Sequence, residues 1–213
     1  MLPDASPVPA AAAAQWAELS DAVLAGLVHM LNNRVTALSV CAELATMGDQ
    51  EMITDGVLTN EVSRLQRASA LIGLLPARPH QPEALELRPI LEDALAIHAH
   101  HPRTRLVACD VAVDGAMQPV RAPRWALLRL MLVVVDVAKD AAAEGARGAT
   151  FQLASDERSA GVRVSAPGLG GPYGAAMAEL CGGQLSRDAD DLVLTFPSLL
   201  LLRQREREAR AGE

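Results

Sequence analysis

One histidine, His29, has the residue type and setting that most clearly suggest chemistry in this chain. It lies in the segment VHMLNNRVTAL, residues 28–38. At about 100° per residue in a helix, an apolar stripe runs along one side of this segment, and His29 points almost directly away from it. A neutral imidazole is a competent nucleophile near pH 7. The pattern predicts a histidine that a helix presents to another protein, and its neighbours on that outer face are small or polar: Ala22, Ala25, Gly26, Asn33 and Thr36.

Two long helices are expected to position His29. The first covers residues 16–47, and after a break at Gly48-Asp49 the second covers residues 50–75, where Pro76 ends it. Such an αα-hairpin cannot cover both of its apolar stripes, so we expect a second copy to complete a four-helix dimer bundle. A monomer with the second domain folded over the hairpin is the alternative. The stripes consist of Leu24, Leu27, Leu31, Val35, Leu38, Ala42 and Ala45 on the first helix and Leu58, Val62, Leu65, Ala68, Ile72 and Leu75 on the second.

Composition limits the class of protein. The chain has 213 residues, of which 50% are hydrophobic and only 2% aromatic, so its core must consist mainly of Leu, Val and Ala. The net charge of −7 and the sequence pI of about 5.2 argue against nucleic acid and against an anionic membrane surface as partners. Three widely spaced cysteines give neither a disulfide framework nor a zinc site. No apolar run reaches the roughly 18 residues of a membrane span, and residues 1–14 read as a disordered leader without the basic region of a signal peptide, so we expect a cytoplasmic protein.

A second domain is expected over residues 87–198, after a proline-rich linker at residues 77–86. Its helical and extended segments predict an α+β fold with helices on one face of a mixed sheet. The helix expected at residues 123–143 is apolar nearly all round and should therefore be buried. Residues 199–213 end in alternating Arg and Glu, which is typical of a solvated helix end. The other expected segments are helices at 87–99 and 175–180 and strands at 105–113, 150–154, 161–165, 184–186 and 192–196.

Several short motifs stand in an order that is typical of one protein family. His29 is followed by Asn32-Asn33, and Cys181-Gly182-Gly183 precedes the last expected strand. With the helices between them, these motifs resemble the phosphoacceptor box and the closing Gly-Gly turn of sensor histidine kinases. The resemblance covers nearly the whole chain after residue 15. It implies a dimerisation and phosphoacceptor hairpin at residues 15–76, followed by a degenerate ATP-binding α/β sandwich.

The second domain departs from the family pattern where nucleotide would bind. Asp136 stands at the position of the family's magnesium-holding Asn, and Leu132 replaces the Asn before it. The position of the adenine-reading Asp is Ala166, which offers no hydrogen-bond acceptor in its side chain. Only a few residues separate Gly170 from the helix at 175–180, so the family's long ATP lid is missing. Since a triphosphate needs backbone N–H groups, a metal ligand and positive charge, ATP binding is expected to be lost.

The phosphoacceptor box departs too. The residue after the histidine, usually an acid that takes the imidazole proton during attack on ATP, is Met30, and the usual Pro is Arg34. Both changes fit a histidine that no longer takes phosphate from ATP. The chain thus resembles the dimeric histidine phosphotransferases built on a degenerate kinase body, of the ChpT type.

That resemblance implies a mechanism in which His29 exchanges a phosphoryl group with the aspartyl phosphate of a response-regulator receiver domain. The expected partners are that receiver, an upstream hybrid kinase and a second copy of the chain. No cofactor of the chain's own is expected, because the receiver brings its Mg²⁺ and lysine. Asn33 is expected to orient the ring or to hydrogen-bond a phosphoryl oxygen, and the residues expected to contact the receiver are Asn32, Arg34, Thr36 and Arg64.

Three other functions remain open at this point. The chain is a non-catalytic pseudokinase that serves as a scaffold, or a response-regulator phosphatase in which Asn33 positions the water, or an ATP-dependent kinase with a divergent pocket. The first two leave His29 unphosphorylated, and the third requires normal nucleotide affinity.

A group of three histidines, His98, His100 and His101, invites a metal interpretation. Pro102 ends the helix there, and the local sequence offers no carboxylate or Cys to complete a ligand shell. We therefore expect a solvated helix end and no metal site. Asp136, isolated in an apolar run, is expected to pair locally if it is buried.

Overall fold

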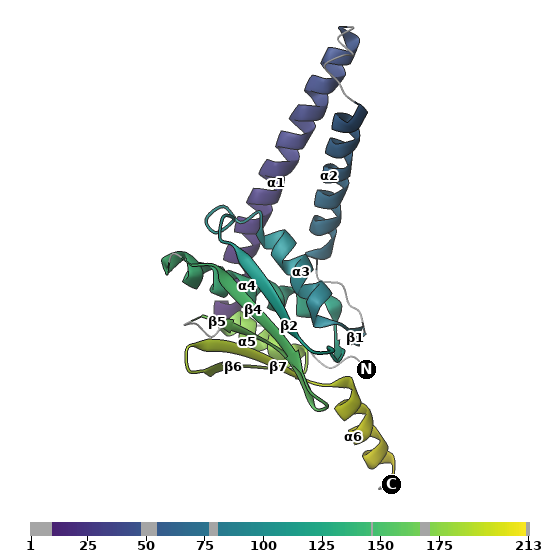
Figure 1. Ribbon diagram of the computed structural model, residues 1–213, viewed down its shortest axis with the longest axis vertical. Helices are drawn as coiled ribbons and strands as arrows, with labels where there is room; N and C mark the ends of the chain where they lie inside the picture. The colour runs from purple at the N-terminus through teal and green to yellow at the C-terminus, as the bar shows by residue number, and fades with distance from the viewer. Residues whose placement is uncertain (1–9, 48–54, 77–80, 146, 167–170, 212–213) are drawn as a thin grey trace.

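The computed structural model of the protein describes residues 10–47, 55–76, 81–145, 147–166 and 171–211. A long helical hairpin stands on a domain that contains the sheet, and the last helix projects from the opposite end (Figure 1). The hairpin consists of α1 (Ala10–Thr46) and α2 (Asp55–Leu74). None of the described helices has the length and apolar character needed to cross a lipid bilayer.

Helix α1 begins earlier than the sequence pattern predicts. Residues 10–14 were expected in a disordered leader, yet they form the first turn of the helix, and Ala12 is fully buried. Alanine has the highest helix propensity, so the alanine run continues the helix once Ala12 has a surface to pack on. The rest of that leader, residues 1–9, and the expected break at Gly48-Asp49 lie outside the described residues.

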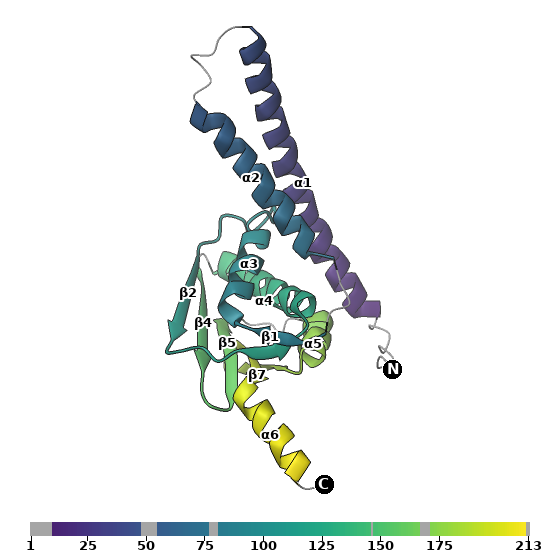
Figure 2. The ribbon, with the colours of Figure 1, turned by 90° about the vertical axis from the view of Figure 1, so that its right-hand side faces the viewer.

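The two ends of the hairpin differ in packing. At its base, Leu19, Val23 and Leu27 of α1 are buried in the core that the hairpin shares with the second domain. Further along, this chain leaves the expected stripes uncovered, because Val35 is 53% exposed and Val62 is 40% exposed. The second domain therefore covers only the base of the hairpin (Figure 2).

The second domain is built on one mixed sheet with helices on a single face (Figure 2). Its strand order is β2-β4-β5-β7-β6, in which β2 and β4 pair in parallel and the other neighbours are antiparallel. A separate antiparallel pair joins β1 to β3. The expected α+β class is confirmed. The strands are β1 (Glu83–Leu85), β2 (Cys109–Asp114), β3 (Val120–Ala122), β4 (Ala149–Ser155), β5 (Ser159–Ser165), β6 (Gln184–Asp188) and β7 (Asp191–Pro197), and the helices are α3 (Leu87–His98), α4 (Arg124–Glu144), α5 (Gly171–Leu180) and α6 (Leu199–Ala211).

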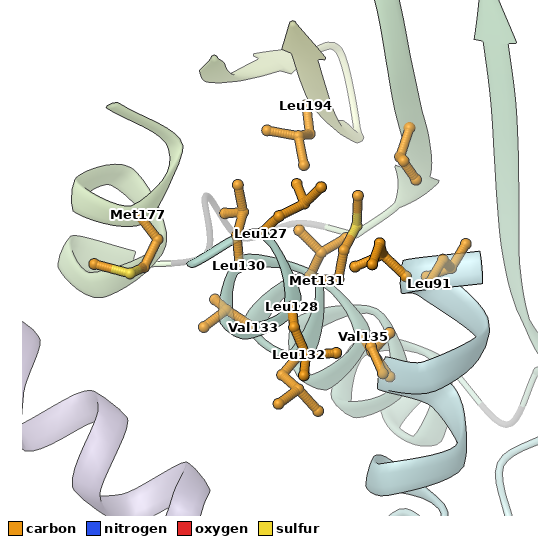
Figure 3. Packing of buried hydrophobic residues seen from close by; sticks show 14 of the residues in the cluster. Leu91, Leu127, Leu128, Leu130, Met131, Leu132, Val133, Val135, Met177 and Leu194 are labelled. Carbon is orange, nitrogen blue, oxygen red and sulfur yellow. The ribbon is translucent and has the colours of Figure 1, made fainter. Parts of the chain in front are cut away.

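Helix α4 lies at the centre of the core. Its side chains are buried on nearly every face, as the sequence predicts, and they meet residues from α3, α5 and the sheet (Figure 3). Leu91, Met177 and Leu194 represent these three neighbours. The only two phenylalanines of the chain, Phe151 and Phe196, are also fully buried. Both phenylalanines thus belong to the core between the sheet and the helices.

Aromatic side chains fix the hairpin to the second domain. Trp16 of α1 stacks on Tyr173 of α5, with ring centroids 5.1 Å apart. The guanidinium of Arg129 lies over the rings of both Trp16, at 4.4 Å, and Trp125, at 5.4 Å. Arg129 also donates to the carbonyl of Leu75 at the end of α2. One arginine of the buried helix therefore joins both helices of the hairpin to the second domain.

Three details of the second domain differ from the sequence expectations. The expected linker contains β1, whose three residues are too few to give an alternating pattern and which needs β3 as its partner. The strand expected at 105–113 is shifted to Cys109–Asp114, because turns occupy the residues before it. Helix α5 begins at Gly171 rather than at residue 175.

Candidate functional site

The side chain of His29 is exposed on the outer surface of α1, as the sequence predicts. Asn33 follows it by one helical turn, and its Nδ2 lies 3.2 Å from His29 Nε2. With the amide as donor, Nε2 is the acceptor, and the ring proton is then on Nδ1. The next residue along, Met30, is partly buried against the core and supplies no acid beside the ring. The arrangement presents an imidazole nitrogen toward solvent with one amide to orient it.

Gly26 does not belong to an open outer face. A Cβ atom at Gly26 would overlap the carbonyl oxygen of His100, which lies in the turn after α3. The turn therefore covers Gly26, and α1 needs a residue without a side chain where it passes the second domain. Because His29 lies one turn further along the same side of α1, it stands just beyond the junction between hairpin and second domain.

An ion network joins α1 to α2 on another face of the hairpin. Both oxygens of the Glu61 carboxylate accept from Arg34 Nη1, at 3.1 Å and 3.0 Å, and Oε1 also accepts from Arg64 Nη1 at 3.2 Å. Glu61 is 9% exposed, so this carboxylate is held between two guanidinium groups with little water. The expected contact residues Arg34 and Arg64 thus meet at Glu61 rather than at His29.

Beside this network is a small basic cavity of about 150 Å³. Arg34, Arg64 and Arg67 line it, together with His100 from the second domain. Sequence reasoning missed Arg67, although its spacing of three from Arg64 on α2 places the two on one side of the helix. The cavity carries more positive charge than the single Glu61 neutralises, which favours an acidic partner surface.

The other two residues expected to contact a partner are exposed on α1. Asn32 is exposed, and its carbonyl oxygen accepts a 2.9 Å hydrogen bond from Thr36 Oγ1. The Thr36 hydroxyl is therefore already used as a donor within the helix. Asn32 and Thr36 flank the ridge that His29 and Asn33 form, whereas Arg34 points to α2.

Two positions at which the resemblance expects nucleotide contacts are buried and apolar, and the cavity beside them is acidic. Leu132 and Ala166 are both buried at 1% exposure. Helix α5 packs so closely on α4 that a Cβ atom at Gly174 would lie 3.1 Å from a Val133 methyl. A cavity of about 430 Å³ lies between α1 and the second domain, and its charged lining residues are Glu18, Asp136, Asp140 and Arg103. The three carboxylates among them repel a triphosphate.

The histidines after α3 are not a solvated helix end. His98 is fully buried and His101 is 4% exposed, and their rings are 4.9 Å apart and nearly parallel. Burial lowers the pKa of the His101 imidazole below its ordinary value. Asp136 was expected to pair locally, but its partner comes from 38 residues earlier in the chain: Asp136 Oδ1 accepts from His98 Nε2 at 2.9 Å. The carboxylate that seemed to be missing from the local sequence is therefore supplied by α4.

No protein-family model matches this chain, and no curated protein matches it. Among solved structures, it is similar to the histidine kinase AdeS of Acinetobacter baumannii at 16% identity, with a TM-score of 0.41, over 80% of this chain and 96% of that one. It is similar to the cytoplasmic segment of the histidine kinase QseC at 14% identity, with a TM-score of 0.42, over 65% of this chain and 92% of that one. A histidine kinase from Burkholderia phymatum is similar at 14% identity, with a TM-score of 0.39, over 90% and 98% of the two chains. Identities and scores at this level carry no functional conclusion, which depends on the residues of this chain.

Proposed function

We propose that this protein is a histidine phosphotransferase that moves phosphoryl groups between His29 and the aspartate of a response-regulator receiver domain, without using ATP. The observation that carries the proposal is the pairing of an exposed His29 with the Asn33 amide on an unbroken helix, with no acid beside the ring. An imidazole in this setting needs a phosphoryl donor that brings its own charge stabilisation.

The second domain supports a donor other than ATP. The side chain at the expected adenine-reading position, Ala166, has no acceptor, and Leu132 is apolar where a polar ligand would be needed. The open cavity beside α4 is lined by Glu18, Asp136 and Asp140, with Arg103 already paired to Asp140 at 3.2 Å. Since a nucleotide needs positive charge around its phosphates, this domain is better suited to docking a protein than to holding ATP.

The transfer step balances without a cofactor bound to this chain. Nε2 of His29 attacks the phosphorus of the aspartyl phosphate, the N–P bond forms, and the P–O bond to the aspartate breaks with the carboxylate leaving. The proton remains on Nδ1 throughout, so no general base is required. The amide of Asn33, displaced from Nε2 by the incoming phosphorus, then donates to a phosphoryl oxygen. The receiver's own Mg²⁺ and lysine stabilise the transferring charge.

The docking surface of the proposal combines the ridge of His29 with the adjacent basic cavity. Asn32 and Thr36 flank the ridge, and Arg64 and Arg67 supply positive charge beside it. A receiver's phosphorylation site is acidic, so the charges are complementary, and association should weaken as ionic strength rises.

We also propose that the chain acts as a homodimer. A groove between α1 and α2 is lined by Leu31, Leu65 and Ile72, and Val35 and Val62 on the same expected stripes are exposed. An exposed apolar surface of this kind on a helical hairpin is typical of a bundle interface. Leu31→Glu or Leu65→Glu should give monomers or aggregates in light scattering. A monomeric wild-type protein at micromolar concentration would contradict the dimer.

The experiment that tests the function follows phosphoryl transfer from purified, phosphorylated receiver domains. Wild type should acquire an acid-labile, base-stable phosphoryl group, and His29→Ala should acquire none while it still binds the receiver. Ser39→Ala, which changes an exposed side chain of the same helix outside the ridge and the basic cavity, is the control and should behave as wild type.

The other outcomes separate the alternatives. Equal labelling of wild type and His29→Ala would overturn His29 as the acceptor. Loss of phosphate from the receiver without labelled protein, abolished by Asn33→Ala, would establish a phosphatase. Receiver binding with neither transfer nor phosphate loss would establish a scaffold.

A further inference from the structure

Three side chains outside the His29 site bring metal-ligating atoms together. They are His98 at the end of α3, His101 in the turn that follows, and Asp136 in the middle of α4. One ligand atom from each lies within 4.8 Å of the others. The ligand atoms of a tetrahedral ion at about 2.1 Å lie roughly 3.4 Å apart, so binding would draw the three side chains closer together.

The surroundings of His101 match those of a metal ligand. Its Nδ1 lies 3.2 Å from Thr104 Oγ1, and both residues are buried. When Nδ1 carries the proton, the ring donates to Thr104, and Nε2 keeps a free lone pair. Metal-ligating histidines are commonly oriented in this way, with the second ring nitrogen donating to an oxygen.

His98 faces Asp136 through its Nε2 atom. The side chain is completely buried, and its Nε2 lies 2.9 Å from Asp136 Oδ1. When the ring proton is on Nδ1, Nε2 keeps its lone pair and directs it at the carboxylate. A cation between these two acceptor atoms would bind both of them.

We propose that His98, His101 and Asp136 bind a divalent transition-metal ion of the Zn²⁺ class. Two imidazoles and one carboxylate are the ligands of zinc sites that keep a fourth position open, whereas Mg²⁺ prefers oxygen ligands only. The Asp136 side chain is 25% exposed and faces the cavity of about 430 Å³, which gives an ion and a water molecule access. Glu18 lines the same cavity and favours a cation there, whereas Asp140 is paired with Arg103.

The ion would join the turn after α3 to the buried helix α4. That turn includes His100, whose carbonyl covers Gly26 one helical turn before His29. Metal binding would therefore rigidify the part of the second domain that borders the hairpin. This consequence does not depend on whether His29 is phosphorylated.

The test uses the full chain, tag-free and treated with a chelator, with Zn²⁺ or Co²⁺ as the probe. We expect one Zn²⁺ per chain by calorimetry, a rise in the unfolding temperature with Zn²⁺ and none with Mg²⁺. Visible Co²⁺ bands should be those of a nitrogen and oxygen site, without the intense thiolate band that cysteine ligation would give. His101→Asn and Asp136→Asn should lose the binding, and His100→Asn, from the same turn, should retain it.

A variant that keeps all three ligands gives a second test of the Zn²⁺ site. Thr104→Val keeps all three ligands and removes only the hydroxyl that orients His101, so it should weaken Zn²⁺ binding about 10- to 100-fold. Loss of Zn²⁺ binding by His101→Asn or Asp136→Asn counts only if circular dichroism shows wild-type secondary structure. If those variants do not fold, Thr104→Val still tests the proposal. Equal Zn²⁺ affinity in wild type and Thr104→Val, or no measurable binding by wild type, would overturn the proposal.

Discussion

The chain contains two histidine sites with opposite surroundings. His29 is exposed on a straight helix, where the Asn33 amide is its described side-chain partner. His98 and His101 are buried between α3 and α4, with Asp136 and Thr104 as partners. An exposed imidazole with free space around it is suited to a reaction with another macromolecule, whereas buried imidazoles beside a carboxylate are suited to holding an ion. The two proposals therefore rest on different burial and different partners of the same residue type.

The helices that carry these two sites also differ in how completely they are packed. Around the buried pair, α4 is packed on nearly every face and the sheet covers one side. Around His29, the hairpin leaves apolar residues uncovered, and its attachment to the second domain is confined to its base. The second domain should therefore depend on internal packing, and the upper hairpin on what binds to it.

Truncating one side chain in each region tests this contrast most strongly. Leu130 of α4 is fully buried, and Leu130→Ala should lower the free energy of unfolding by about 2–5 kcal/mol. Val40 of α1 is 48% exposed and lies off the expected stripe, so Val40→Ala should change it by no more than about 0.5 kcal/mol. Urea denaturation measures both. Equal losses would show that the two regions are packed alike.

The junction between the regions is tested by two glycines on the hairpin. Gly26→Ala places a methyl group against the His100 carbonyl, so α1 must move away from the second domain at a cost of about 1–3 kcal/mol. Gly73→Ala on α2 meets nothing within 4 Å and should stabilise the protein by about 0.5–1 kcal/mol. Thermal unfolding, with Trp16 near the junction as a fluorescent reporter, distinguishes the two. A stabilising Gly26→Ala would contradict the close approach.

The ion network of the hairpin should contribute less to the free energy of unfolding than the packing contacts above. Glu61→Gln leaves Arg34 and Arg64 close together without a carboxylate, and should cost roughly 1–2 kcal/mol. The control is Glu92→Gln, which breaks an exposed pair with Arg88 on α3 and should cost about 0.3–0.5 kcal/mol. Denaturant midpoints at low and high salt measure the difference. Equal losses of stability in Glu61→Gln and Glu92→Gln would mean that the burial of Glu61 does not strengthen its ion pairs.

The smallest change in stability is expected from replacing Asp156, in the turn between β4 and β5. Backbone N–H groups of Ser159 and Arg158 donate to its carboxylate and lower its pKa below the ordinary value of 3.8. The stabilisation is therefore present above that value and is lost as the pH falls through the lower pKa of the folded state. Asp156→Asn should be slightly less stable than wild type at pH 7 and equal to it in strong acid. A difference that persists at the lowest pH would contradict this cause.

Much of the architecture follows from local sequence pattern. The buried helix α4 is evident because its apolar residues leave no polar face, and the exposed position of His29 follows from the helical repeat. Strand β1 and the early start of α1 could not be predicted in this way. Both depend on contacts made after the chain has folded: β1 on pairing with β3, and Ala12 on a buried surface.

The two histidine sites also differ in whether the local sequence predicts them. His29 and Asn33 lie four residues apart on one helix, so their proximity is readable from spacing. The carboxylate that pairs with His98 comes from Asp136, 38 residues later on a different helix, and local reasoning therefore missed it. Gly26 was taken for part of an open face, because nothing in its spacing indicates that the turn at His100 packs on it.

The most direct test of the central claim compares two phosphoryl donors on the same protein. Wild type is incubated in parallel with radiolabelled ATP and with a radiolabelled phospho-receiver domain, and the label is located on the chain. We expect label on His29 from the receiver and none from ATP. Label from ATP, or label from the receiver that survives in His29→Ala, would contradict a phosphotransferase that works through His29.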